Sequence, residues 1–371
     1  MNKPRLLVLS QFLSGGGAVQ VFLRVLQNLD PTLFDIHFGI LSEERPATGP
    51  LPAYLTLHRL RIPRARHAAF ALVRLIRSVQ PDLIVCANSH ICQLLLIVRP
   101  LLPAKTRIVG RLETTASQLP RTRLRNFLYS TVYRSADAIL CQSESMADDL
   151  IRHFGHIRER IHVLPNPIDL APAPAGSPCP WPPGPGPRLL AIGRLSPEKG
   201  FLTLLEAVAP LRDRWPHLQL SLLGIGPEES DLRARIRELG LSQSVSLPGQ
   251  IRNPVEYCRD ATLFVLSSTR EGMPNAMLEA AAAGLPLVLP DTFPALNSLL
   301  AHAPGVWFAQ QNPVTPTPSL SAALASALQT LHRPGSRPAR FQHTFLAPFG
   351  LENSIPAWQQ CLLHLATGDL P

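Results

Sequence analysis

The sequence predicts an α/β fold made of two domains, each built around a parallel sheet. Short apolar segments of strand length alternate with helical segments along most of the 371 residues, and this alternation is typical of parallel sheets. The alternation is interrupted at Ala171–Pro187, where eight prolines and three glycines in 17 residues prevent regular structure. The chain is also longer than one typical domain. We therefore expect an N-terminal domain over residues 1–170, a linker over 171–187 and a C-terminal domain over 188–345.

The first half supplies six predicted strands with helices between them. Each strand is a short apolar run, and each helix places apolar residues three and four positions apart. The predicted strands are Arg5–Leu9, Phe34–Gly39, Leu83–Cys86, Arg107–Val109, Ala138–Cys141 and Ile161–Leu164. The predicted helices are Val19–Leu29, His67–Val79, Thr122–Ser135 and Ser145–His153.

The second half repeats this scheme after the linker. Its predicted strands are Arg188–Ile192, Leu218–Leu223, Val245–Leu247, Leu263–Leu266 and Leu287–Leu289. Its predicted helices are Gly200–Arg214, Glu229–Glu238 and Ala276–Ala283. Two open α/β domains bind ligands at the carboxyl ends of their strands, so we expect the chemistry in a cleft between the domains.

The end of the chain is less regular than the rest. Two proline-rich segments, Asn312–Pro318 and Arg333–Pro338, are predicted to be loops. The last apolar pattern, Ile355–Leu365, predicts one closing helix within residues 346–371. We expect this helix to pack back on the first domain.

The excess of positive charge lies in the first half of the chain. The net charge is +9, and residues 1–170 contain 21 lysines and arginines against 12 acidic residues, whereas the remainder has 14 of each. Such a field attracts phosphates, nucleic acid or an anionic membrane surface. Arg121, Arg123 and Arg125 precede an apolar and aromatic stretch, which is typical of a basic amphipathic helix that binds such a surface. An ordinary surface helix is the alternative.

Composition also bears on the compartment and on metal chemistry. No apolar run reaches the roughly 18 residues that a membrane span needs, and the start of the chain lacks the apolar core of a signal peptide. We expect a cytoplasmic protein that associates at most peripherally with the inner face of the cell membrane. The six cysteines show neither a CxxC pair nor zinc-ligand spacing, so we predict no disulfide framework and no metal site.

Two glutamates eight residues apart, Glu271 and Glu279, form the first candidate site. Glu271 precedes a predicted helix and Glu279 lies inside it, so they are at most about 12 Å apart, the length of a nucleotide-sugar between ribose and hexose. Carboxylates accept hydrogen bonds from vicinal hydroxyls, and amide groups at a helix start suit a diphosphate. The residues around that start are Gly272, Met273, Pro274 and Asn275. A helix cap with a surface glutamate is the alternative.

Two cations, Arg194 and Lys199, form the second constellation. They lie on one predicted strand-to-helix loop, Gly193–Gly200, whose sequence is GRLSPEKG. Departure of a nucleoside diphosphate builds negative charge on its phosphates, and paired cations stabilise that charge. Only three of the 35 basic residues are lysines, so this lysine does not come from a lysine-rich surface. A solvated basic loop is the alternative.

A glycine-rich loop, Ser14–Ala18, follows the first predicted strand and opens the first helix. Its three glycines allow the backbone to approach a phosphate closely, although a flexible turn would have the same composition. The loop matches neither the dinucleotide-binding fingerprint nor a Walker loop.

Together these motifs resemble glycosyltransferase family 4 on the GT-B fold. The resemblance rests on GRLSPEKG, on the E-x7-E spacing from Glu271 to Glu279, on the turn Leu164–Asp169 and on the glycine loop. It covers nearly the whole chain and implies two Rossmann-like domains facing across a cleft, retention of anomeric configuration and no metal or other cofactor.

The resemblance also implies roles for individual residues. Arg194 and Lys199 would hold the diphosphate, Glu271 the sugar hydroxyls and Glu279 the ribose. The segment from Gly249 to Ile251 would border the base, and Gly16 and Gly17 would approach the phosphates from the first domain.

The chain departs from the family pattern on the acceptor side. Many relatives have a histidine after the strand that reads here as Arg107–Val109, whereas this chain has Gly110–Thr114. Glu113 could take that role, with Arg111 and His90 as the alternatives. The usual glycine of the Leu164–Asp169 turn is Pro167 in this chain.

These observations favour a retaining hexosyl or N-acetylhexosaminyl transferase. We expect a nucleotide-sugar donor, UDP being the favoured nucleotide, and a lipid-linked or surface-polysaccharide acceptor, such as bacterial lipopolysaccharide. The two glutamates are too far apart for a hydrolytic carboxylate pair. A nucleotide-sugar epimerase and a non-catalytic nucleotide-sugar-binding subunit are the alternatives. Nucleic acid is a poor partner, because no stacking platform interleaves the basic residues.

Overall fold

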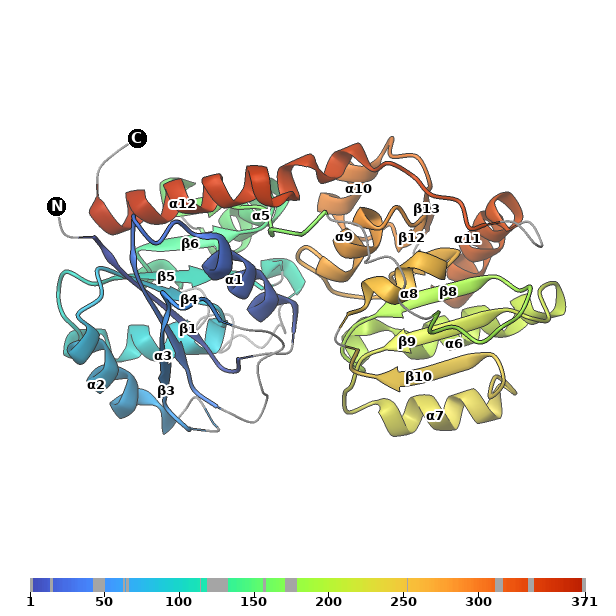
Figure 1. Cartoon of the computed structure of the whole chain (residues 1–371), viewed down its shortest axis with the longest axis horizontal. Coiled ribbons are helices and arrows are strands. Elements are labelled where there is room, and N and C mark those ends of the chain that lie inside the picture. Colours follow the sequence, from blue (N-terminus) through green and yellow to red (C-terminus); the bar gives the residue numbers. More distant parts are fainter. Residues whose placement is uncertain are drawn as a thin grey trace. The chain divides into compact units, whose positions relative to one another are not determined.

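The computed structural model divides the chain into two compact units (Figure 1). Unit 1 comprises Met1–Ile168 and Pro348–Pro371, and unit 2 comprises Asp169–Ala347. The structure describes residues 3–13, 16–42, 51–62, 64, 67–113, 115–118, 133–155, 158–170, 179–251, 253–310, 316–332 and 337–368. The segment with Arg121, Arg123 and Arg125 lies outside these residues.

Unit 1 is built on a seven-stranded parallel sheet in the order β3-β2-β1-β4-β5-β6-β7. The strands are β1 (Arg5–Ser10), β2 (Asp35–Ile40), β3 (Thr56–Arg59), β4 (Leu83–Cys86), β5 (Arg107–Arg111), β6 (Ala138–Cys141) and β7 (Ile161–Val163). All six strands predicted for this half are present. The strand β3 was not expected, because it is an edge strand that alternates polar and apolar residues and has no long apolar run.

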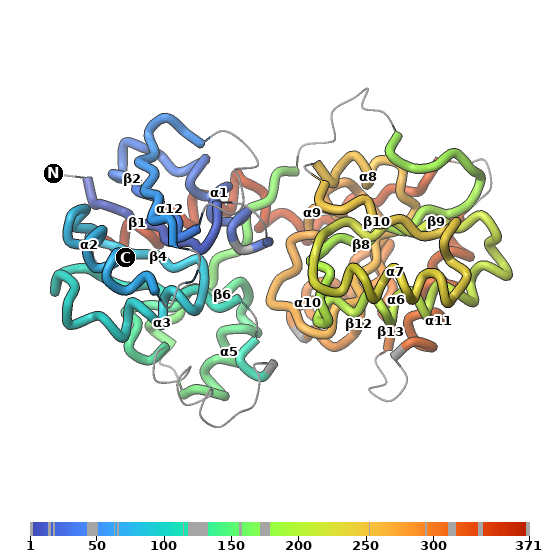
Figure 2. Tube along the Cα trace, turned by 90° about the horizontal axis from the view of Figure 1, so that it is seen from below, coloured from blue at the N-terminus to red at the C-terminus, as the bar shows by residue number. Residues whose placement is uncertain are grey.

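Helices cover both faces of this sheet. They are α1 (Gly17–Asn28), α2 (Ala69–Val79), α3 (Ser89–Ile97), α5 (Glu144–Phe154) and α12 (Leu351–Thr367), with short 3-10 turns η2 (Arg99–Leu101), η3 (Ala116–Gln118) and η4 (Arg158–Arg160). Alternate strand residues point to opposite faces. Leu6 and Val8 therefore join one core with α1 and α12, whereas Leu7 and Leu9 join another with α2 and α3. Figure 2 traces the backbone of these strands and helices in a second view.

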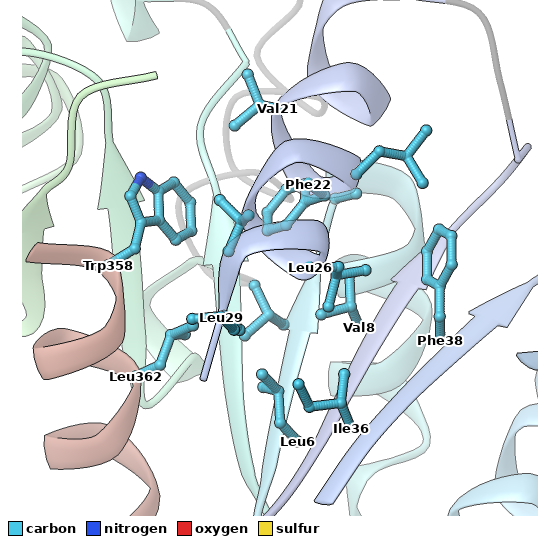
Figure 3. Packing of buried hydrophobic residues seen from close by; sticks show 14 of the residues in the cluster. Leu6, Val8, Val21, Phe22, Leu26, Leu29, Ile36, Phe38, Trp358 and Leu362 are labelled. Atoms are coloured by element: carbon cyan, nitrogen blue, oxygen red, sulfur yellow. The ribbon is translucent and has the colours of Figure 1, made fainter. Parts of the chain in front are cut away.

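The predicted closing helix is α12, and it packs on the first domain as expected. Trp358 is buried and its ring meets Phe22 of α1 edge to face, with centroids 5.6 Å apart (Figure 3). The Trp358 Nε1–H donates to the carbonyl of Pro165 over 2.8 Å, so the buried indole is fully satisfied. The end of the chain thus completes the core of unit 1.

Unit 2 is built on a six-stranded parallel sheet in the order β10-β9-β8-β11-β12-β13. The strands are β8 (Arg188–Ile192), β9 (Gln219–Leu223), β10 (Val245–Gly249), β11 (Leu263–Val265), β12 (Leu287–Pro290) and β13 (Val306–Ala309). The helices are α6 (Phe201–Val208), α7 (Glu229–Glu238), α8 (Val255–Asp260), α9 (Asn275–Ala282), α10 (Pro294–Leu300) and α11 (Pro316–Leu331). The 3-10 turns are η5 (Pro197–Lys199), η6 (Ala209–Asp213) and η7 (Thr344–Phe349). The last of these crosses the boundary between the units in the sequence. The five strands predicted for this half are present.

One predicted loop in unit 2 is wrong in its second part. Residues 316–318 of the expected loop Asn312–Pro318 begin α11, the 16-residue helix that packs against α6 and the sheet. Proline is tolerated in the first turn of a helix, because the amide group that it lacks has no partner within the helix there. The prolines therefore mark the start of a helix in this segment.

No helix in the described part of the chain is both long and apolar enough to cross a membrane.

Candidate functional site

The strand order of unit 2 reverses at β8. The chain passes from β8 to β9 and β10 on one side of the sheet, and then returns to β11, β12 and β13 on the other. The loops after β8 and β11 therefore diverge at the carboxyl edge, which is where open α/β sheets bind their ligands. The two candidate constellations of the C-terminal half follow these two strands.

A short ion pair joins these loops. The Nζ of Lys199, in the loop after β8, lies 2.6 Å from Oε1 of Glu271, in the loop after β11. The Lys199 side chain is 22% exposed and that of Glu271 is 11% exposed, so the pair is largely shielded from water. The aliphatic stem of Lys199 lies against Gly193, where an added Cβ would lie 3.3 Å from Cδ. Lys199, which is predicted to bind the diphosphate, and Glu271, which is predicted to bind the sugar hydroxyls, are thus in direct contact.

Backbone contacts hold the two loops together. The amide of Thr269 donates to the carbonyl of Glu198 over 2.8 Å, and the Ser267 hydroxyl donates to the carbonyl of Lys199 over 2.8 Å. Gly200 has φ +63°, and an added Cβ would lie 2.2 Å from the carbonyl oxygen of Ser267. The close approach at this point requires glycine.

Arg194 is the outer cation of the site. Its side chain is 64% exposed, and its Nη2 lies 3.6 Å from Oε1 of Glu198. The Ser196 hydroxyl donates to the same oxygen over 2.6 Å. Partial burial acts to raise the pKa of the Glu198 carboxyl, but the hydrogen bond from Ser196 and the charges of Arg194 and Lys199 lower it below its ordinary value. Glu198 therefore stays ionised beside the cations.

The first turn of α9 begins at Asn275, shortly after Glu271, and Pro274 is the helix cap. The segment before it is buried at Gly272, Met273 and Pro274, and Asn275 opens the helix half-buried. Glu279 lies inside α9, as predicted, and its charge adds to the dominant effect of burial in raising the pKa of Cys258 on α8 to about 12. Glu279 is therefore near α8, whereas Glu271 is at the sheet edge.

The loops after β9 and β10 complete this edge. The Gly224 amide donates to the carbonyl of Gly249 over 2.8 Å, and the Leu195 amide donates to that of Ile225 over 3.0 Å. Gly249 has φ +83°, and nothing lies within 4 Å of an added Cβ there. Ile251 is half-buried beyond it. The predicted base-bordering segment thus shares the carboxyl edge with Arg194 and Lys199.

Unit 1 has a second reversal of strand order, at β1. The chain goes from β1 to β2 and β3 on one side and then returns to β4 on the other. Gln11 follows β1 and Asn88 follows β4, and the amide of Gln11 donates to Oδ1 of Asn88 over 3.0 Å. Asn88 Nδ2 in turn donates to Oε1 of Glu113, after β5, over 3.0 Å. His90 Nε2 lies 3.2 Å from the Gln11 amide oxygen.

These four residues, Gln11, Asn88, His90 and Glu113, are referred to below as the unit 1 polar cluster. Burial lowers the pKa of the His90 ring below its ordinary value, and the charge of Glu113 opposes that shift. The ring is thus largely neutral at pH 7 and can donate or accept a hydrogen bond. Two of the acceptor-side candidates, Glu113 and His90, therefore share one cluster at the carboxyl edge of the unit 1 sheet.

Arg111, the third acceptor-side candidate, has different surroundings. It is 4% exposed, its Nη2 donates to Oδ1 of Asn166 over 2.9 Å, and its guanidinium lies 5.6 Å from the Phe22 ring centroid. Burial lowers the pKa of Arg111 to about 10, so the group remains charged at neutral pH. In these surroundings Arg111 fastens the Leu164–Asp169 turn to the sheet.

Gly16 and Gly17 lie at the start of α1, after β1 in the chain. Gly16 has φ +89°, and nothing lies within 4 Å of an added Cβ. Both glycines are exposed, so their backbone is accessible to a ligand. Ser14 and Gly15 of the same loop lie outside the described residues.

Sequence reasoning missed several members of these groups. The residues not expected from the sequence to belong to a site are Gln11, Asn88, Ser196 and Glu198. Gln11 and Asn88 are the first polar residues after β1 and β4, and their position at the carboxyl ends of these strands could have indicated them. In the part of the chain that the structure describes, no group of three or more histidine, cysteine or acidic side chains is arranged to hold a metal ion.

Each half of the chain matches a glycosyltransferase family model. Residues 15–172 match the model described as Glycosyltransferase Family 4, and residues 186–333 match the model described as Glycosyl transferases group 1. Both matches support a glycosyltransferase, as the sequence motifs indicated.

Two comparisons with individual proteins extend this result. The chain is 31% identical over 192 residues to the N-acetylgalactosamine-N,N'-diacetylbacillosaminyl-diphospho-undecaprenol 4-alpha-N-acetylgalactosaminyltransferase of Campylobacter jejuni. It is 32% identical over 157 residues to the lipopolysaccharide core biosynthesis glycosyltransferase LpsE of Rhizobium meliloti. The matches cover 50% and 42% of this chain, and 52% and 44% of these relatives. The chain thus spans about half the length of the curated relatives it matches.

A solved structure confirms the fold class. Sucrose-phosphate synthase from Thermosynechococcus elongatus superposes with a TM-score of 0.78 at 17% identity, over 99% of this chain and 100% of that one. Two Rossmann-like domains of the GT-B class were expected from the sequence, and this expectation is confirmed.

Proposed function

We propose that this chain, whose two halves match glycosyltransferase domains, is a retaining and metal-independent hexosyl or N-acetylhexosaminyl transferase. The donor is a nucleotide-sugar, with UDP as the favoured nucleotide. The acceptor is lipid-linked or part of a cell-envelope polysaccharide. The Lys199–Glu271 ion pair at the reversal of strand order in unit 2 carries the proposal.

The pair suits the bond that breaks in the reaction. In a nucleotide-sugar, one phosphate oxygen joins the diphosphate to the anomeric carbon of the sugar. A lysine ammonium donates up to three hydrogen bonds to phosphate oxygens, and a carboxylate accepts from sugar hydroxyls. Because Lys199 and Glu271 are 2.6 Å apart, they would bind the two parts of the donor on either side of that bond.

The same edge suits the charge that develops as the bond breaks. The leaving diphosphate gains negative charge, which Lys199, Arg194 and the amide groups at the start of α9 would stabilise. Glu198, which accepts a hydrogen bond from Ser196, lies 3.6 Å from Arg194. Glu271, bound to sugar hydroxyls, would fix the ring for attack. A leaving phosphate oxygen can take the proton of the acceptor hydroxyl, so the chemistry needs no enzyme nucleophile.

Relatives and neighbours support the donor and acceptor classes. The name of the Campylobacter relative describes transfer of N-acetylgalactosamine to a diphospho-undecaprenol acceptor. The Anabaena HepE protein, a structural neighbour with a TM-score of 0.70 at 17% identity that covers 98% of this chain and 100% of that one, is described in complex with UDP and glucose. We assign the donor to unit 2 and the acceptor to the unit 1 polar cluster.

The first test is a thermal-shift screen of the purified chain with UDP-, GDP- and ADP-sugars in EDTA. A ligand at 100 times its dissociation constant stabilises a protein by about 2.7 kcal/mol, so we expect a clear rise in melting temperature with one nucleotide class. The bound donor is then incubated with polyprenyl-diphosphate saccharides in EDTA, and the product's anomeric configuration is read by NMR. Conversion of the donor sugar without an acceptor would instead identify an epimerase, and inversion or a strict metal requirement would contradict the mechanism.

The unit 1 polar cluster gives a prediction for the acceptor. Glu113→Gln removes a charge that Asn88 holds in place, and a hydrogen bond to a charged group contributes about 1.5 to 3 kcal/mol. We expect the acceptor KM to rise at least about tenfold, with unchanged donor affinity, and Asn88→Ala to act in the same direction. Asn28→Ala, which removes an exposed 2.8 Å hydrogen bond to the Arg24 carbonyl, is the control. A change in donor affinity alone would refute this assignment.

A further inference from the structure

Three large apolar side chains of unit 1 are strongly exposed on neighbouring elements. Phe70 on α2 is 81% exposed, Ile97 on α3 is 71% exposed and Leu101 on η2 is 52% exposed. Isolated exposed apolar residues are common, but an apolar group with charged neighbours indicates a binding surface.

The outer face of α2 combines apolar and basic residues. Leu72, Ile76 and Val79 are buried toward the sheet. At about 100° per residue, Phe70, Arg74 and Arg77 lie on the opposite side of the helix, where both arginines are exposed. An aromatic residue and two cations therefore follow one another along the outside of α2.

The exposed ends of α3 and η2 lie beside this face. Both α2 and α3 contribute to the same core on one side of the sheet, and Arg77 Nε donates to the carbonyl of Leu101 over 3.0 Å. Ile97 is opposite the buried residues of α3, as Phe70 is opposite those of α2. We call Phe70, Arg74, Arg77, Ile97 and Leu101 the α2–α3 surface.

The segment of the chain that forms this surface carries mostly positive charge, and Arg99 of η2 is paired with Asp137 over 2.7 Å. Residues 59–112 contain ten lysines and arginines and a single acidic residue, Asp82. That carboxylate is engaged, since Oδ1 lies 3.2 Å from Lys105 Nζ and Oδ2 accepts from the Arg5 amide over 2.9 Å. A partner of this surface must therefore offer negative charge together with an apolar phase.

We propose that the α2–α3 surface docks on an anionic lipid bilayer. Phe70, Ile97 and Leu101 enter the boundary between headgroups and acyl chains, while Arg74 and Arg77 bind headgroup phosphates. Long arginine stems allow the charged ends to stay in the headgroup layer as the apolar residues insert. The residues of this surface are not those of the segment with Arg121, Arg123 and Arg125, which lies outside the part of the chain that the structure describes. Its docking depends neither on donor nor on acceptor chemistry.

The test is flotation of the purified full chain with vesicles that contain no saccharide. One set is phosphatidylcholine alone, and the other contains one third phosphatidylglycerol. We expect binding to the anionic vesicles only, weakened by high salt. Phe70→Ser with Ile97→Ser should lower the partition coefficient at least about tenfold, and Arg74→Ser should lower it by about fivefold, whereas Arg74→Lys should preserve it. Melting temperatures verify that the exposed substitutions leave folding intact.

Two variants of unit 2 serve as matched controls. Ile225 is 44% exposed and Arg237 is an exposed arginine of α7, so Ile225→Ser and Arg237→Ser remove the same kinds of side chain elsewhere. Both should bind vesicles as the unmodified chain does. The proposal is overturned if the unmodified chain does not float with the vesicles or if it binds neutral and anionic vesicles equally well. It is also overturned if the α2–α3 variants bind as well as the controls. It is likewise overturned if Phe70→Ser changes only the oligomeric state. Transferase activity does not enter any of these outcomes.

Discussion

Lys199→Ala should lower kcat/KM for sugar transfer by about two to three orders of magnitude, which is the usual loss when one donor to a developing negative charge is removed. Lys199 Nζ is held 2.6 Å from Glu271 and is the more shielded of the two cations in its loop, with 22% of the side chain exposed against 64% for Arg194. A shielded cation stabilises a phosphate more strongly than one in water. Steady-state kinetics with saturating acceptor measure the effect.

Glu271→Gln should separate the two parts of the donor. In thermal-shift titrations, we expect Lys199→Ala to weaken binding of the free nucleoside diphosphate and of the whole donor alike. Glu271→Gln should leave the free diphosphate bound and remove only the additional stabilisation that the sugar provides. If the two variants weaken both ligands to the same extent, the division of roles is wrong.

The two residues should also be energetically coupled. Removing one partner leaves the other charge shielded and unpaired, so the double variant Lys199→Ala with Glu271→Gln should lose less than the sum of the single losses, by at least about 1 kcal/mol. The control is the exposed pair Arg233–Glu229, whose atoms are 2.8 Å apart with side chains 50% and 41% exposed. That pair should couple by less than about 1 kcal/mol in stability and leave kcat/KM unchanged. Additive losses at Lys199 and Glu271 would contradict a joint site.

The sequence predicts the sheets well because buried parallel strands are continuous apolar runs. Leu83–Cys86 and Ala138–Cys141 have the bounds expected from the sequence. The missed strands, β3 and β13, both lie at sheet edges, and β3 also carries polar residues. Loops and helix ends are harder to predict, because proline is compatible both with a loop and with the first turn of a helix. Pro316 was expected in a loop, whereas it begins α11.

The candidate sites were predictable as motifs and not as contacts. Lys199 and Glu271 are 72 residues apart, and they meet because β11 pairs with β8. Gln11 and Asn88 are 77 residues apart and meet because β4 pairs with β1. Strand order is decided by the packing of whole helices on the sheet, so the spacing of residues along the chain cannot reveal which loops share an edge.

Gly200→Ala should lower both stability and activity, since this glycine sets the position of Lys199. At φ +63° an alanine costs about 1 to 2 kcal/mol from backbone conformation alone. Its Cβ would lie 2.2 Å from the Ser267 carbonyl oxygen, so the two loops must also separate. Crowding of this kind costs about 1 to 3 kcal/mol more. We expect a total loss of about 2 to 5 kcal/mol in the free energy of unfolding of unit 2.

Gly240→Ala is the matched control, because Gly240 has nearly the same backbone conformation without the close approach. Its φ is +67°, and nothing lies within 4 Å of an added Cβ. This variant should lose only the conformational part, about 1 to 2 kcal/mol, and keep full transfer activity. The difference between the two variants, read from urea unfolding and from kcat/KM, isolates the contact of Gly200 with Ser267. Since that contact ties the loop of Lys199 to the loop of Glu271, Gly200→Ala should reduce donor affinity even where the protein remains folded. Equal losses in the two variants would mean that the loops can separate without cost and that the ion pair does not depend on their close packing.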